Sequence, residues 1–131
     1  MSFLIDSDRV ADFLNGKPDG VELFRTLAPA GFPISVVMTY GEILDGVYYG
    51  RDPARHEAVF TAFLVGVAIL PVTASISERF ARIRGDLRRR GQLIGDLDIL
   101  IGATALEYNL TIVTRNRERY ERIPGLSTHP S

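Results

Sequence analysis

The chain of 131 residues contains no cysteine. It can therefore form neither a disulfide nor a metal site built on thiolates, and it has no thiol nucleophile. Long hydrophobic runs are also missing: the stretch from Val65 to Val72 is interrupted by glycine and proline and is far too short to span a membrane. The first six residues lack the basic start and the apolar stretch of a signal peptide. We therefore expect a cytoplasmic protein that has no membrane contact.

Lysine is almost absent. Of the 15 basic residues, Lys17 is the one lysine, and the arginines cluster between Arg79 and Arg90 and between Arg115 and Arg122. Arginine binds phosphate through a planar fork of N–H donors, which lysine cannot offer. The net charge of −1 argues against a protein that coats nucleic acid passively. The clusters predict either local phosphate contacts or ordinary solvated helix faces.

What is present is an alternation of short apolar runs with amphipathic segments. The runs at 3–5, 33–38, 67–70 and 110–113 predict buried strands, and apolar residues at helical spacing predict helices between them. This alternation is typical of an α/β fold with a parallel sheet of four to five strands and helices on both faces. The sequence shows no repeat and no second domain, so we expect residues 1–131 to form a single domain with a loose tail from Ser127.

The stretch from Gly95 to Tyr108 organises the predicted site. Its apolar residues follow helical spacing, and Asp96 and Asp98 stand at the expected helix start, where the helix dipole favours negative charge. Gly102 and Ala105 share the face of Asp98, which predicts open space for a sugar-phosphate beside that carboxylate. The alternative is that either aspartate only caps the helix.

Polar residues gather where the predicted strands end. Asp6, Glu42 and Asn116 stand at or just after the ends of three strands, and Asp96 and Asp98 belong to the same edge of the sheet. In open parallel sheets this edge binds ligands. Carboxylates in such proximity cannot all stay ionised without a cation, and oxygen ligands alone favour Mg²⁺ or Mn²⁺.

Carboxylate-held metal can orient and deprotonate water and can stabilise a phosphoryl group during in-line displacement. The chain has no glycine-rich phosphate loop before a lysine, which argues against nucleoside triphosphate hydrolysis. Phosphodiester hydrolysis therefore fits better. For Glu42 an alternative stays open, because Thr39 and Glu42 match a capping box in which the carboxylate returns to the Thr39 N–H.

Four segments stand in an informative order and spacing: 3–8 (FLIDSD), 39–42 (TYGE), 94–103 (IGDLDILIGA) and 112–116 (IVTRN). Together they resemble the motifs of PIN-domain nucleases, and most closely the VapC-type ribonuclease toxins of bacterial toxin–antitoxin pairs. The resemblance implies a PIN-like three-layer fold and an Mg²⁺- or Mn²⁺-dependent endoribonuclease acting on tRNA, rRNA or mRNA. It also implies a cognate antitoxin as partner and a homodimer.

The resemblance assigns roles residue by residue. Asp6, Glu42 and Asp98 match the catalytic, metal-binding acids of the family. Asp96 becomes a secondary metal ligand or a cap, and Asn116 a secondary ligand. These assignments describe one acidic site at the sheet edge.

The chain departs from the family at one position of this site. The family often has a fourth acid three residues after the asparagine of the Thr-Arg-Asn motif, where this chain has Arg119. The departure predicts one well-held metal ion, with Arg115 and Arg119 binding the RNA backbone beside it.

Two other functions compete with this interpretation. Asp6-Ser7-Asp8 after a strand also resembles the nucleophile and acid of haloacid-dehalogenase-like phosphatases, but no lysine ends a later strand and the chain is short for that fold. A PIN-like RNA-binding module with weak catalysis is the other rival, and Arg119 supports it. The retention of three acids at the sheet edge argues against it.

Overall fold

The computed structural model describes residues 2–27, 34–35, 37–65 and 67–130. Within them the strands form one sheet in the order β3-β2-β1-β4-β5, and every neighbouring pair is parallel. The strands are β1 (Phe3–Ile5), β2 (Ile34–Ser35), β3 (Ile69–Leu70), β4 (Thr111–Val113) and β5 (Ser127–Thr128). The first strand lies at the centre and is paired along its whole length with β4. Parallel neighbours need crossover connections, which the helices supply.

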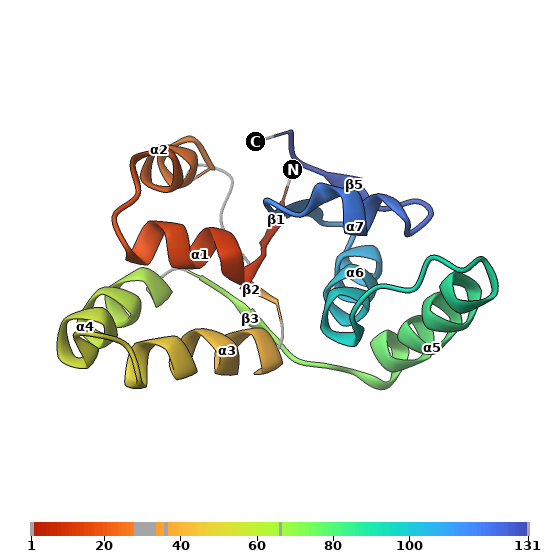
Figure 1. The fold of residues 1–131 in the computed structure, drawn as a ribbon, viewed down its shortest axis with the longest axis horizontal. Helices are drawn as coiled ribbons and strands as arrows, with labels where there is room; N and C mark the ends of the chain where they lie inside the picture. Colours follow the sequence, from red (N-terminus) through yellow and green to blue (C-terminus); the bar gives the residue numbers. More distant parts are fainter. Residues whose placement is uncertain (1, 28–33, 36, 66, 131) are drawn as a thin grey trace.

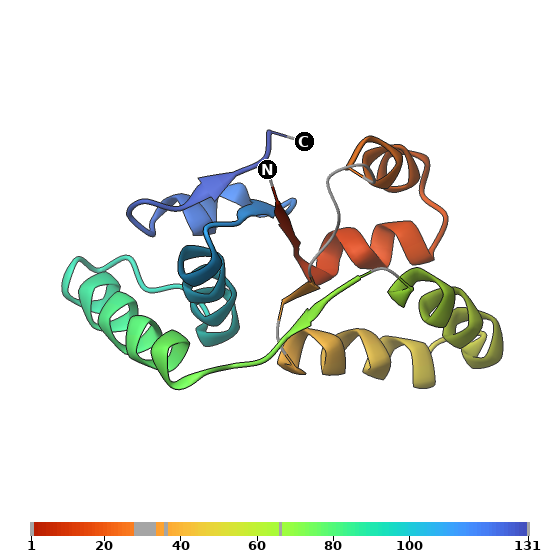
Figure 2. The same ribbon diagram turned by 180° about the vertical axis from the view of Figure 1, so that it is seen from behind.

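Helices cover both faces of this sheet. They are α1 (Ser7–Leu14), α2 (Pro18–Leu27), α3 (Val37–Tyr48), α4 (Pro53–Leu64), α5 (Ala74–Arg89), α6 (Asp96–Tyr108) and α7 (Arg117–Glu121). Figures 1 and 2 show α1 to α4 on one side of the strands and α5 to α7 on the other. Among the described helices, none has both the length and the apolar character that a membrane crossing requires.

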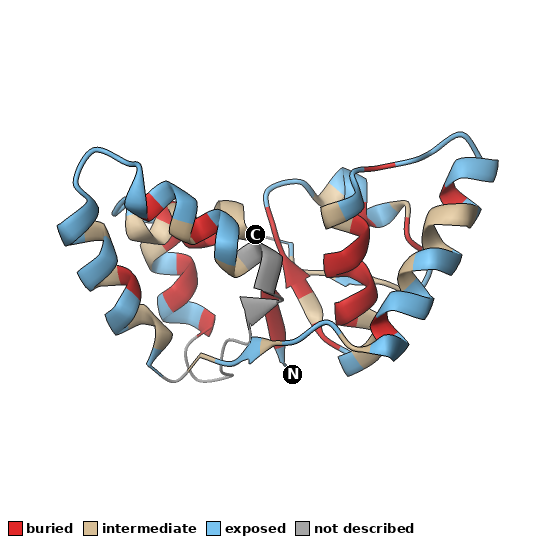
Figure 3. Ribbon diagram, turned by 90° about the horizontal axis from the view of Figure 1, so that it is seen from below, coloured by how far each residue is buried: buried red, intermediate tan, exposed pale blue. Residues whose placement is uncertain are grey.

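Two cores form because successive side chains of a strand point to opposite faces. Phe3 and Ile5 of β1 pack into the cluster that α1 to α4 contribute, whereas Leu4 packs with Ile112 and the apolar faces of α5 to α7. Figure 3 shows the resulting burial along the central strands and α6. The predicted three-layer α/β architecture is thereby confirmed.

The second predicted strand, residues 33–38, extends too far towards the C-terminus. Of its described residues, Ile34 and Ser35 form β2, whereas Val37 and Met38 already belong to α3. Short apolar runs fit a buried helix as well as a buried strand, so periodicity alone could not separate them. Since α3 starts before Thr39, that residue is not its N-cap and the predicted capping box is wrong.

Residues 127–129 of the predicted loose tail are held in the fold, and Ser131 lies outside the described residues. Ser127 and Thr128 form β5, which pairs in parallel with β4, and the His129 N–H donates to the Ile112 carbonyl at 2.8 Å. The ring of His129 also meets that of Phe3 edge-on, with centroids 5.6 Å apart. Strand pairing through backbone groups needs no hydrophobic pattern, and so the strand could not be predicted from the polar composition of this segment.

The predicted open face beside Asp98 is also wrong. Gly102 is buried, and a Cβ atom built on it would lie 2.6 Å from Cδ1 of Ile123. Ala105 is fully buried in the core. The small residues of α6 therefore allow the segment after α7, which contains Ile123, to pack closely against the helix, and this packing leaves no room there for a sugar-phosphate.

Asn109 ends α6 in the left-handed region, with φ of 53°. This geometry places the Leu110 N–H against the Ala105 carbonyl at 2.8 Å and turns the chain into β4. We expect Asn109→Ala to lower the free energy of unfolding by ~1 kcal/mol, because a Cβ without a compensating polar group is disfavoured in this region. Asn109→Gly is the matched control, and urea unfolding should show equal or higher stability for it. Equal losses in both variants would contradict the backbone explanation.

Candidate active site

Asp6 ends β1 and caps α1, which places its carboxylate at the carboxyl edge of the sheet. Oδ1 accepts the Ser7 N–H at 2.8 Å, and Oδ2 accepts hydroxyl donors from Thr114 at 2.8 Å and from Tyr120 at 3.1 Å. Burial, and next the charge of Asp8, raise the pKa of Asp6 from 3.8 to about 6 against the opposing effect of these hydrogen bonds. The residue is therefore a buried acid whose charged form is only partly compensated.

Asp8, in the first turn of α1, completes the link between α1 and the end of β4. Its Oδ2 accepts the Arg115 N–H at 3.1 Å, the Asn116 side-chain amide at 3.2 Å and the Thr114 hydroxyl at 3.3 Å. Its Oδ1 is buried and has no hydrogen-bond partner in the described part of the chain. Sequence reasoning considered Asp8 only for the phosphatase alternative and did not assign it to the metal-binding acids, although its position two residues after Asp6 was a usable signal.

Asp98, in the first turn of α6, lies on the other side of the Tyr120 hydroxyl. That hydroxyl is 3.4 Å from Asp98 Oδ1 and 3.1 Å from Asp6 Oδ2, and Arg119 Nη1 donates to Asp98 Oδ2 at 3.2 Å. Burial and the neighbouring carboxylates of Asp6 and Asp98 raise the pKa of Tyr120, so its hydroxyl stays a donor. No feature of the sequence had singled out Tyr120.

Glu42 of α3 is the third acid of this edge, and the neighbouring charge that acts on it is that of Asp98. Partial burial, followed by the charge of Asp98, raises the pKa of Glu42. A cleft of about 630 Å³ runs beside it along α1 and α3. Asp8 lines the cleft from the N-terminal end of α1 and Glu42 from the middle of α3, and Arg51 and His56 line it beyond the end of α3.

Three further residues that the sequence predicted for the site, Asp96, Asn116 and Arg115, form hydrogen bonds or ion pairs with other protein groups. Asp96 is exposed and accepts from Arg84 Nε at 2.8 Å, away from Asp6 and Tyr120. Asn116 uses its side-chain amide as a donor to Asp8. Arg115 is half exposed, but its Nε lies 3.2 Å from the buried carboxylate of Asp12.

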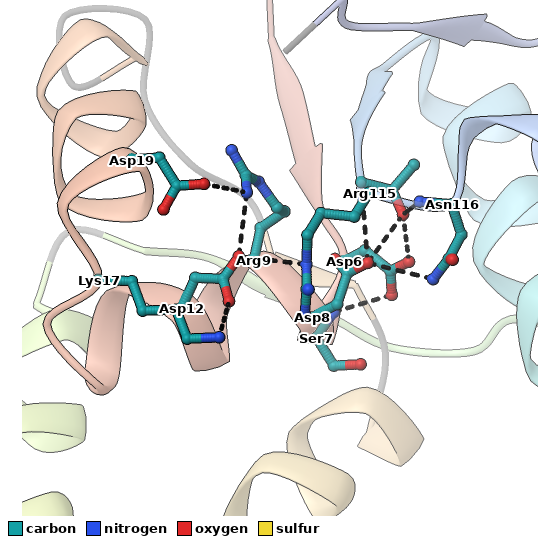
Figure 4. Close-up of polar contacts among 10 residues, drawn as sticks. Asp6, Ser7, Asp8, Arg9, Asp12, Lys17, Asp19, Arg115 and Asn116 are labelled. Carbon is teal, nitrogen blue, oxygen red and sulfur yellow. Dashed lines mark hydrogen bonds and ion pairs between the residues drawn. The ribbon is translucent and has the colours of Figure 1, made fainter.

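Figure 4 shows how a buried ion-pair network supports this edge. Asp12 of α1 is surrounded by Arg9 at 3.0 Å, Arg115 at 3.2 Å and Lys17 at 3.6 Å, and Arg9 also reaches Asp19 at 3.4 Å. A buried carboxylate is tolerated only when cations and donors compensate it. The network therefore ties the turn after β4 to α1 and helps to hold Thr114 and Asn116 where they meet Asp6 and Asp8.

The carboxylates at this edge of the sheet are chemically suited to a divalent cation but are not yet arranged around one. Within residues 2–27, 34–35, 37–65 and 67–130, no three Asp, Glu or His side chains lie together as a ready metal site. The chemistry of the edge nevertheless suits a hard cation: it offers carboxylate oxygens, burial and then the charges of neighbouring acids raise the pKa values of Asp6 and Glu42, and Asp8 Oδ1 has no partner among the described residues. Side-chain rotation, above all of Glu42 and Arg119, would have to bring the acids onto one ion.

The sequence matches a known protein family over almost its whole length. Residues 3–126 match the family model described as PIN domain. The chain is 30% identical to the tRNA(fMet)-specific endonuclease VapC of Shigella flexneri over 98% of its own length and 96% of that protein.

Solved structures extend the similarity to the fold. The crystal structure of VapBC2 from Rickettsia felis bound to a promoter DNA fragment matches with a TM-score of 0.87, at 25% identity and 98% coverage of both chains. DNA-bound VapBC from Salmonella typhimurium matches with a TM-score of 0.86, at 27% identity, covering 98% of this chain and 97% of that one.

Proposed function

The chain belongs to the PIN domain family, in its VapC-type branch, and from this we propose that it is a divalent-cation-dependent endoribonuclease, the toxin of a type II toxin–antitoxin pair. The observation that carries the proposal is the convergence of Asp6 and Asp98 on the Tyr120 hydroxyl at the carboxyl edge of the sheet. Two acids from distant segments share one donor there, and the charge of a third, Glu42, is disfavoured by partial burial and then by Asp98.

Asp6, Asp98 and Glu42 would hold the cation, Mg²⁺ or Mn²⁺, and Asp8 is added to them because its buried Oδ1 has no donor among the residues that the structure describes. When bound, such an ion supplies a polarised water and stabilises charge on the phosphoryl group. Asp96 is the weakest candidate ligand because it already pairs with Arg84. Asn116 holds Asp8 in place and serves only as a secondary ligand.

The protein's own residues perform the remaining tasks of the proposed reaction. Tyr120 is fully buried, and its single hydroxyl proton is shared between Asp6 Oδ2 at 3.1 Å and Asp98 Oδ1 at 3.4 Å, which keeps the two carboxylates close together. Arg115 and Arg119 carry positive charge at the same edge, where an RNA backbone would approach. Arg115 is anchored on Asp12 and so presents its guanidinium with little loss of side-chain entropy.

We further propose that a cognate antitoxin restrains the enzyme and that the toxin forms a homodimer. The two solved neighbours are VapBC2 from Rickettsia felis and VapBC from Salmonella typhimurium, each bound to DNA. The cleft along α1 and α3 opens beside Asp8 and Glu42, so a C-terminal segment of the antitoxin lying in it would cover the acidic edge.

The proposal predicts metal-dependent RNA cleavage by the purified, antitoxin-free chain. Initiator tRNA is the first substrate to test, because a relative 30% identical to this chain is named for it; other tRNAs and rRNA fragments complete the panel. Cleavage is expected with Mg²⁺ or Mn²⁺ and should disappear with EDTA. EDTA-resistant cleavage would refute the metal dependence. RNA binding without cleavage under all conditions would instead favour the binding-module alternative, which the Arg119–Asp98 ion pair supports.

A further inference from the structure

Helix α7 supplies donors to both oxygens of Asp98. Arg119 Nη1 donates to Oδ2 at 3.2 Å, and the hydroxyl of the next residue, Tyr120, lies 3.4 Å from Oδ1. The two donors differ in freedom: Tyr120 is fully buried in the core, whereas the Arg119 side chain is 52% exposed. One donor is therefore fixed, and the other can leave without unpacking the protein.

We propose that Arg119 is a built-in cation that neutralises Asp98 in the metal-free protein and sets the affinity of the site for a divalent ion. The inference rests on the proposed function, since it concerns the same acids. A guanidinium remains charged at all accessible pH values, and so it competes with a metal ion for Asp98 instead of yielding by deprotonation. An ion that binds Asp98 must either displace Arg119 or suffer its repulsion.

The surroundings of Asp98 show why such a cation is useful. Glu42 already has its pKa raised by burial and by the charge of Asp98, and Asp6 shares the Tyr120 hydroxyl with it. Without Arg119, the metal-free site would contain these carboxylates without any cation bound to Asp98. Arg119 thus stabilises the empty site and, once displaced by a metal ion, offers a free guanidinium to an RNA phosphate beside it. Metal and RNA binding are then coupled, each favouring the other.

The chain contains a matched control for this inference. Arg84 forms an ion pair with Asp96 at 2.8 Å, in the same first turn of α6 and two residues before Asp98. Arg84→Gln changes the net charge as much as Arg119→Gln does and also breaks an arginine–aspartate pair. It leaves the contacts of Asp98 unchanged. Any general effect of charge will therefore appear in both variants.

The test is Mn²⁺ titration of the EDTA-dialysed, full-length protein by isothermal calorimetry. Arg119→Gln is expected to tighten Mn²⁺ binding roughly tenfold, because the repulsive charge is removed from the site. Arg119→Lys, which keeps the charge, should stay close to the wild type, as should Arg84→Gln. In EDTA, Arg119→Gln should melt at a lower temperature than the wild type, and Mn²⁺ should raise its melting temperature by a larger amount.

Mn²⁺ affinity and RNA cleavage together distinguish failure of this inference from failure of the proposed function. Unchanged Mn²⁺ affinity in Arg119→Gln, or an equal gain in Arg84→Gln, overturns the inference, and RNA cleavage by the wild type would show that the proposed function survives it. Absence of Mn²⁺ binding up to millimolar concentration in both the wild type and Arg119→Gln refutes the inference and the metal dependence together. Tighter Mn²⁺ binding with no RNA cleavage supports the inference while the nuclease proposal fails.

Discussion

Asp98→Asn is expected to reduce RNA cleavage at least ~100-fold, whereas Asp96→Asn should leave it within a few-fold of the wild type. The two aspartates belong to the same turn of α6 but differ in their surroundings. Asp98 lies within reach of the Tyr120 hydroxyl and largely inside the protein, and Asp96 is exposed and paired with Arg84. Only Asp98 is placed to share a cation with Asp6.

Stability measurements separate this role from helix capping. The N-cap of α6 is Gly95, without a side-chain capping bond, so Asp98→Asn loses no cap. Its ion pair with the half-exposed Arg119 is worth at most ~1 kcal/mol, and removing the charge also relieves Glu42. Single-turnover cleavage and urea unfolding should therefore show a large loss of activity with little change in stability. An Asp98→Asn protein that cleaves RNA normally would refute the assignment of Asp98.

The metal-free protein is expected to lose stability as the pH rises from about 4 towards 7. The pKa of Asp6 is 3.8 before its shift and about 6 in the folded chain, chiefly because of burial. Between these values the folded state binds more protons than the unfolded state, so the free energy of unfolding falls with rising pH. The benefit of the protonated carboxyl is complete below about pH 4 and is lost above about pH 6. A shift of this size corresponds to ~3 kcal/mol.

Asp6→Asn should remove this part of the pH dependence. The amide carries no charge to bury and keeps an oxygen for the Ser7 N–H and a polar group for the Thr114 and Tyr120 hydroxyls. At pH 7 in EDTA the variant should therefore be more stable than the wild type, and near pH 4 the two should be alike. Cleavage should be lost at every pH.

Asp86→Asn, at an exposed ion pair on α5, is the control for pH effects at distant sites. Urea unfolding of the three proteins from pH 4 to 8 provides the measurement. If wild type and Asp6→Asn have parallel stability profiles, Asp6 does not carry the buried charge penalty described here. Glu42 also has a raised pKa, so part of the wild-type slope should remain in the variant.

Local patterns in the sequence were sufficient to predict the layers and the edge that carries the site. Short apolar runs separated by helical periodicity indicate a parallel sheet covered on both faces, and β1 and β4 occur where those runs stand. Asp6 follows β1 directly and Asn116 comes three residues after the end of β4, and so their position at the carboxyl edge follows from the direction of the chain. The left-handed end of α6 at Asn109 is also a local property of that residue type.

The structure of segments without such a pattern could not be predicted from the sequence. The backbone pairing of Ser127 and Thr128 with β4 requires no apolar side chain, and the apolar run around Val37 fits a helix or a strand equally well. The face around Gly102 appeared open because the sequence does not reveal which segment packs on it. The structure places Ile123 there.

The order of residues along the sequence by itself determined that carboxylates gather at one edge of the sheet, because residue type and distance from a strand end are local quantities. Which donor meets which acid was decided by tertiary structure alone. Asp8 meets Asn116 across 108 residues, and Tyr120 meets Asp6 across 114. Arg119 turns to Asp98 because α7 packs against α6 with Tyr120 buried in the core. Side-chain direction at such separations depends on how the helices pack, which no spacing along the chain encodes.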